Sequence, residues 1–95
     1  MVLGVSMNNY KIRVNNEAES REAQELFFEL GYKWRSEGSK ISYLYENYLF
    51  SESDGYLTYS SNLSTFNKDE GKEINLPQLR ELFKPQGELI SGVEA

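Results

Sequence analysis

Apolar and polar residues alternate along the first ordered-looking stretch of this chain, residues 10–14. Tyr10, Ile12 and Val14 point one way, whereas Lys11 and Arg13 point the other way. A period of two residues is typical of a strand with one buried face. The pattern therefore predicts a half-buried strand that ends at the following asparagines.

Residues 17–30 have a helical spacing instead. Asn16 and Glu19 resemble a capping box at the start, and Gly31 lies where a C-terminal cap glycine belongs. Phe28 falls outside the apolar stripe, which predicts partial exposure or an interface. The stripe has a spacing of i, i+3, i+4 and i+7 and consists of Ala23, Leu26, Phe27 and Leu30.

Short strands are predicted next, over residues 32–35 and 41–45, separated by a turn at 36–39. Asp54-Gly55 then lies between two strand-like runs, 48–53 and 56–60. This dipeptide favours a type I′ hairpin turn. Such a turn pairs Ser53 with Tyr56. It predicts one shared core face, made by Tyr48, Phe50, Leu57 and Tyr59.

The remaining residues complete one domain of 95 residues. Residues 61–71 are polar and turn-rich, with Phe66 as an anchor, and residues 72–76 form a strand or an extended lead-in. Pro77 favours a short helix over residues 77–83, which buries Leu79, Leu82 and Phe83.

The predicted fold is α+β. A twisted, mostly antiparallel sheet of four to five strands carries one long helix on a face and a short C-terminal helix. The termini, 1–8 and 86–95, are expected to be loose. Leu89, Ile90 and Val93 can form an arm that docks on a neighbouring subunit, and residues 1–6 can be an extension of the native start.

Composition narrows the possible chemistry. The chain has no histidine and no cysteine, which removes Ser-His-Asp, Cys-His and ordinary zinc sites. The acidic pairs Glu52–Asp54 and Asp69–Glu70 fit solvated turns better than a catalytic pair. Residues 67–71 lack the frame of a calcium loop, and the chain contains no P-loop. We therefore expect no enzyme activity, no metal and no cofactor.

The net charge of −5 argues against a protein that coats nucleic acid. It is compatible with a solvated surface, with a basic partner or with mimicry of nucleic acid. No segment approaches the ~20 apolar residues of a membrane span, and the start lacks the features of a signal peptide. The sequence thus predicts a cytosolic protein without membrane contact.

One cluster is a candidate ligand-binding site: Lys33, Trp34, Arg35, Tyr43 and Tyr45. Aromatic rings beside cations are used to stack bases and to pair with phosphates. The alternative is that Trp34 and one row of tyrosines complete the core while Lys33 and Arg35 are solvated. Seven tyrosines exceed what a small core can accommodate, which favours recognition at the surface.

The run from Tyr10 to Leu82 resembles small tailed-phage accessory proteins of the early, anti-defence type. Three phrases carry the resemblance: residues 10–17, residues 23–32 and residues 72–82. It implies a non-catalytic binding protein in the cytoplasm of an infected bacterial host, and it is compatible with a homo-oligomer. Such a binder neutralises host defence by occupying a defence protein or by sequestering a small nucleotide signal. The alternative is a structural or regulatory phage module, from the virion or a transcription-modulating complex.

Overall fold

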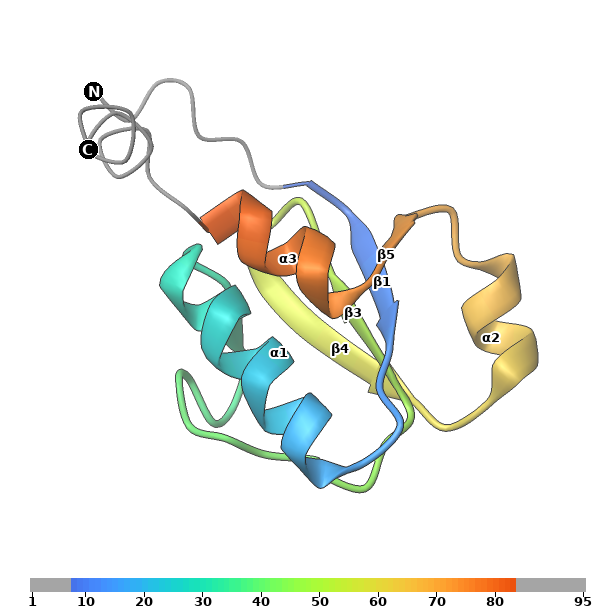
Figure 1. The fold of residues 1–95 in the computed structure, drawn as a ribbon, viewed down its shortest axis with the longest axis horizontal. Helices are drawn as coiled ribbons and strands as arrows, with labels where there is room; N and C mark the ends of the chain where they lie inside the picture. The colour runs from blue at the N-terminus through green and yellow to red at the C-terminus, as the bar shows by residue number, and fades with distance from the viewer. Residues whose placement is uncertain (1–7, 84–95) are drawn as a thin grey trace.

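The computed structural model describes residues 8–83 of the chain. The predicted arm around Leu89, Ile90 and Val93 lies outside these residues, as do residues 1–6. The described part contains five strands and three helices (Figure 1). The strands are β1 (Tyr10–Arg13), β2 (Lys33–Trp34), β3 (Tyr48–Ser51), β4 (Tyr56–Ser60) and β5 (Lys72–Ile74). The helices are α1 (Glu17–Glu29), α2 (Leu63–Lys68) and α3 (Leu76–Phe83).

The strands form one sheet in the order β2-β4-β3-β1-β5. The β1–β3 and β3–β4 pairs are antiparallel, whereas β1–β5 and β2–β4 are parallel. The α+β class is confirmed, and the sheet is mixed. The parallel β2–β4 pair follows from α1, which crosses over the sheet and returns the chain to its far edge in the direction of β1.

Helix α1 begins where the sequence predicts and ends at Glu29, one residue before the predicted end. The Asn16 side chain accepts a hydrogen bond of 2.8 Å from the amide of Glu19, and Gly31 has a φ of 106°. The Glu19 carboxylate, however, accepts from the amide of Asn15 rather than that of Asn16. The cap thus satisfies two amides, those of Glu19 and Asn15. In a capping box, the second amide would be that of Asn16.

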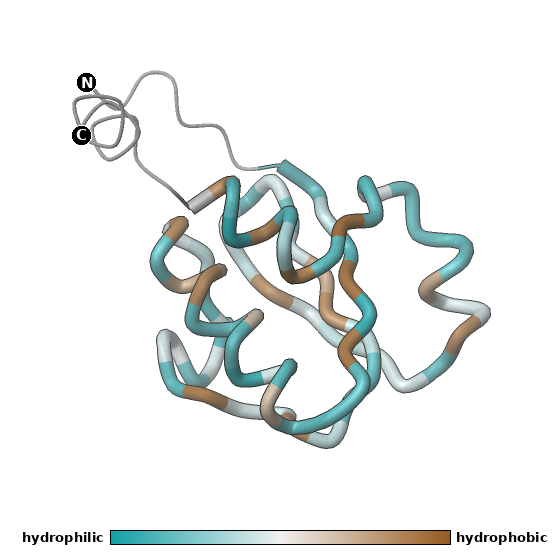
Figure 2. Tube along the Cα trace, viewed as in Figure 1, coloured by the Kyte–Doolittle hydropathy of each residue, from teal (hydrophilic) through white to brown (hydrophobic). Residues whose placement is uncertain are grey.

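Helices α1 and α3 lie together over one face of the sheet (Figure 1). Apolar positions recur along both helices and along the strands (Figure 2). Phe28, as predicted, is only partly buried. The core between these layers is formed by Ile12, Val14, Ala23, Phe27, Tyr32, Trp34, Leu49, Leu57, Ile74 and Leu79.

The opposite face is covered only in part. Phe66 of α2 is 1% exposed, and its ring lies 4.8 Å from the Tyr48 ring and 6.1 Å from the Phe50 ring, centroid to centroid. The predicted anchor is confirmed. The helix around it was missed because its short apolar pattern is embedded in polar residues; the Asn62 side chain caps it by accepting from the amides of Ser64 and Thr65.

The predicted hairpin register is wrong by one residue. Ser51 pairs with Leu57, and the amide of Gly55 donates to the carbonyl of Glu52. Gly55 has a φ of 92°, and Asp54 has a negative φ, so the turn is a type I turn followed by a glycine bulge and not type I′. The shift places Tyr48 and Phe50 on one face of the sheet and Leu57 and Tyr59 on the other.

The strand predicted over residues 41–45 is also absent from the described structure. Residues 35–47 form an irregular loop in which Tyr43 has a φ of 53°. A left-handed residue interrupts an extended strand, and it is uncommon for a side chain as bulky as tyrosine. The loop folds back against α1, where the backbone of Ser42 bonds to Gln24. The alternation of apolar residues did not indicate this contact.

Candidate functional site

A buried amide holds three segments of the chain together at the β2 edge of the sheet. Gln24 of α1 is fully buried, and its Oε1 accepts from Nε1 of Trp34 (3.0 Å) and from the amide of Ser42 (2.9 Å). Its Nε2 donates to the carbonyl of Ser42 (2.6 Å) and to Oγ of Ser20 (3.1 Å). Gln24 therefore fixes strand β2 and the irregular loop to α1, and through Ser42 it positions Tyr43.

Three aromatic side chains meet beside this amide, and we call them the edge cluster: Trp34, Tyr43 and Tyr59. The Tyr43 and Tyr59 rings are stacked, with centroids 4.3 Å apart and planes inclined by 26°. The Trp34 ring packs edge-on against Tyr43 at 4.7 Å and against Tyr59 at 6.1 Å. Trp34 is buried, whereas Tyr59 is 43% exposed, so the cluster extends from the core to the surface of the protein.

A polar group borders the edge cluster. The Tyr43 hydroxyl donates a hydrogen bond of 2.8 Å to Oε2 of Glu37. This bond raises the pKa of Tyr43, because ionisation of the phenol would place two negative charges together. Ionisation of Tyr43 is therefore disfavoured further, and the Glu37 side chain lies at the rim of the cluster.

A shallow pocket of about 190 Å³ opens at the edge cluster. Its walls come from the turn after β2, from the irregular loop and from β4. The lining residues are Trp34, Arg35, Ser36, Glu37, Tyr43, Leu57, Thr58 and Tyr59. Rigid aromatic rings and a few polar groups make this hollow suited to holding a side chain of a partner molecule.

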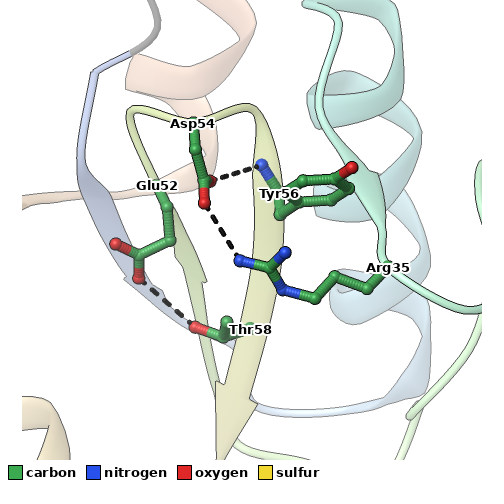
Figure 3. Close-up of polar contacts among 5 residues, drawn as sticks. All are labelled: Arg35, Glu52, Asp54, Tyr56 and Thr58. Atoms are coloured by element: carbon green, nitrogen blue, oxygen red, sulfur yellow. Dashed lines mark hydrogen bonds and ion pairs between the residues drawn. The ribbon is translucent and has the colours of Figure 1, made fainter.

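Lys33 lies on the other face of the sheet with Tyr56, and Arg35, which also lines the pocket, reaches the same tyrosine ring. The Arg35 guanidinium lies 4.2 Å and the Lys33 ammonium 5.8 Å from the centroid of the Tyr56 ring. Arg35 also pairs with Asp54, Nη2 to Oδ2 at 3.0 Å (Figure 3). The two cations thus share one ring, and one of them is already neutralised.

Tyr45 stands apart from both groups. It is 84% exposed and lies in the turn that precedes β3. It lines a separate hollow of about 160 Å³ with Val14, Asn16 and Glu46. Of the five residues predicted as one ligand site, Trp34, Arg35 and Tyr43 line one pocket. Lys33 shares the Tyr56 ring with Arg35, and Tyr45 lies apart.

Sequence reasoning missed Tyr59, Glu37 and Gln24 as members of the site. Tyr59 was assigned to the wrong group of neighbours because the hairpin register was one residue off. Gln24 lies outside the predicted apolar stripe, and the buried face of α1 is rotated toward it and contains Ser20, Ala23, Gln24 and Phe27.

One of the two carboxylate pairs considered for catalysis, Glu52 and Asp54, lies at the hairpin turn, where Asp54 contacts Arg35. Asp69 of the other pair lies beside Lys11 and Gly71. Asp54 is engaged by Arg35 and accepts from the amide of Tyr56 through Oδ1. Partial burial raises the pKa of Glu52, and the charges of Asp69 and Asp54 add to the effect. A raised pKa suits a proton donor, but an acid also needs a partner group, and the neighbouring Asp54 is paired with Arg35.

Within residues 8–83, no group of three or more carboxylate side chains is placed to hold a metal ion. In the same part of the chain, no helix combines the length and the apolar character that a membrane crossing requires. Comparison of the chain with protein-family models, with curated proteins and with solved structures found no match.

Proposed function

We propose that this protein is a non-catalytic binding protein that holds a partner at the edge cluster. In the setting that the phage resemblance implies, it antagonises a host defence system stoichiometrically in the bacterial cytoplasm. One observation carries the proposal: the stacked Tyr43–Tyr59 pair lies at the surface, beside a pocket, on a base that Gln24 makes rigid. Rigid tyrosines lose little entropy on binding and are enriched where proteins meet.

The pocket favours a defence protein as the partner rather than a captured nucleotide. At about 190 Å³ it is smaller than the roughly 300–1,000 Å³ of pockets that enclose small ligands. Of its two charged lining residues, Glu37 opposes a phosphate by charge repulsion, and the cation Arg35 is already paired with Asp54. A single side chain of a protein partner fits these dimensions.

Sequestration of a nucleotide signal is the second candidate, and Lys33, Arg35 and Tyr56 favour it. Two cations beside one ring can pair with phosphates while a base stacks. Thermal shift against cyclic di- and oligonucleotides and ADP-ribose-type signals tests this version. An increase in the melting temperature with excess ligand supports it, and no increase eliminates it.

A plating assay tests the main proposal. The protein is expressed in bacteria that each carry one cloned defence system, and the plating efficiency of a restricted phage is measured. We expect one system to be neutralised by the wild type and by Ser64→Ala, a surface control on α2, but not by Tyr59→Ala. Restriction unchanged across a broad panel contradicts the proposal. Recovery of polymerase or capsid subunits with the protein would instead support the structural or regulatory alternative.

A further inference from the structure

At the C-terminal end of β4, the backbone is hydrogen-bonded to a neighbouring strand on one side only. The amide of Glu52 donates to the carbonyl of Tyr56, so this pair belongs to the bonded set of the antiparallel ladder. The bonds of such a ladder recur at every second residue. The carbonyl of Tyr56 therefore bonds to Glu52, Thr58 and Ser60 bond to β3, and the backbone groups of Leu57 and Tyr59 point the other way.

Strand β2 occupies that other side but ends early. It pairs with β4 only at Tyr56 and Leu57. At Trp34 the chain turns away, because the amide and carbonyl of Trp34 bond to Gly38. The N–H and C=O of Tyr59 consequently lie beyond the end of β2, and no strand within residues 8–83 pairs with Tyr59 on that side.

This edge also lacks the usual protection against strand pairing. Natural edge strands carry charges, prolines or bulges that block the addition of another strand. Residues 56–62 contain no charged residue and no proline. An uncharged edge with an unpaired donor and acceptor can accept an extended segment.

The pocket lies in the same space. Its walls include Ser36 and Glu37 from the turn after β2, and Thr58 and Tyr59 from β4. A strand placed there would continue the line of β2 alongside β4. Since side chains of a strand alternate, every second one would face the rings of the edge cluster.

We propose that the edge of β4 at Tyr59 binds an extended, basic segment of the partner protein as an added strand. The inference rests on the proposed function, since it specifies how the same site holds its partner. The basic character follows from the net charge of −5 and from Glu37 on the rim, which a lysine or arginine of the segment can pair with. The other charged residue of the pocket, Arg35, is already paired with Asp54. Main-chain hydrogen bonds between the segment and β4 give the affinity. The edge cluster gives the specificity, because it contacts one side chain of the segment.

A second copy of this chain fits the edge less well. Antiparallel pairing of two β4 strands around Tyr59 places Ser61 of the second copy opposite Leu57. The pairing of Trp34 with Leu57 already takes that position. Two chains of charge −5 also repel each other.

The test uses seven-residue peptides selected from a displayed random library on the wild-type chain. The best peptide is synthesised, and amide hydrogen exchange of the protein is followed by NMR with and without it. We expect the selected peptides to be basic, and the amide of Tyr59 to exchange at least about tenfold more slowly in the complex. The amides of Thr58 and Ser60 bond to β3 already and should change little.

Two variants separate the backbone from the ring. Tyr59→Val removes the ring and keeps the N–H, whereas Tyr59→Pro removes both. An outward-facing edge amide is a place where a strand tolerates proline, and circular dichroism confirms the fold of each variant. We expect Tyr59→Val to weaken peptide binding and Tyr59→Pro to abolish it.

Three results would overturn the inference. Peptides that bind without slowing exchange at Tyr59 refute strand addition and leave the binding proposal standing. Protection of the Tyr59 amide that depends on protein concentration, without peptide, assigns the edge to a second copy. A library that yields no peptide, together with a failed plating assay, removes both proposals.

Discussion

The indole of Trp34 donates a hydrogen bond of 3.0 Å to the side-chain amide of Gln24, ten residues earlier in the chain. The same amide oxygen accepts from the backbone of Ser42, so one buried group joins helix, strand and loop. The position of Tyr43, next to Ser42, depends on this junction. The edge cluster is therefore built on a core polar contact and not on the surface loop alone.

Replacing Gln24 should destabilise the whole domain. In Gln24→Leu, the Trp34 Nε1 and the Ser42 amide lose their acceptor, and each buried donor left alone costs about 1–3 kcal/mol. We expect a loss of about 2–4 kcal/mol in the free energy of unfolding, measured with urea, and a shift in tryptophan fluorescence. Glu25→Leu, at an exposed neighbour, should change stability by under about 0.5 kcal/mol. Equal stability of both variants would contradict the role of Gln24.

Removing the α2 anchor should cost as much as removing a core residue. Phe66 is buried against Tyr48 and Phe50, so Phe66→Ala should lower the free energy of unfolding by about 3–5 kcal/mol. Leu63→Ala is the matched control on the same helix, because Leu63 is 49% exposed. It should cost under about 1 kcal/mol in the same urea experiment. A Phe66→Ala loss no larger than that of Leu63→Ala would show that α2 is not anchored on the sheet.

The raised pKa of Glu52 should be visible in the pH dependence of the protein's stability. Its pKa is raised in the folded protein, first by partial burial and then by the charges of Asp69 and Asp54. A carboxyl with a raised folded pKa contributes stability that is present below its unfolded pKa and is lost as the pH rises through the folded pKa. Glu52→Gln should therefore melt at a higher temperature than the wild type near pH 7. The difference should vanish below about pH 4.

Thermal unfolding between pH 3 and pH 8 measures this effect. Glu25→Gln, at an exposed position of α1, is the control for simple removal of one negative charge. A Glu52→Gln difference that is the same at every pH, or that is matched by the control, would refute the assignment.

The hairpin turn should be sensitive to a methyl group at Gly55. Its φ of 92° is a conformation that alanine adopts poorly, so Gly55→Ala should lower the free energy of unfolding by about 1 kcal/mol. Ser53→Ala in the same turn should be close to neutral. If Gly55→Ala were also neutral, the glycine bulge and the register that follows from it would be wrong.

Local patterns predicted the local elements well. The period of two at residues 10–14, the stripe of α1 with its cap at Asn16 and the Pro77 start of α3 each depend on near neighbours in the chain. α3 begins at Leu76, one residue before the predicted start. The α+β class followed from the order of these elements.

The candidate site could not be predicted in the same way, because it depends on long-range pairing. The Asp54-Gly55 dipeptide is compatible with two turns, and the choice between them moves Tyr59 from one face of the sheet to the other. Tyr43 reaches Tyr59 through a left-handed backbone conformation that Gln24 supports from another element. Neither relation leaves a pattern among neighbouring residues.

Site-specific photocrosslinking during infection tests the central claim most directly. A benzoyl-phenylalanine is placed at position 59, in the edge cluster, or at position 64, on the exposed surface of α2, and the cells are irradiated. The account predicts a covalent adduct with one host protein at position 59 and none at position 64. No adduct at position 59, or the same adducts at both positions, would contradict the assignment of the edge cluster as the place where this protein holds its partner.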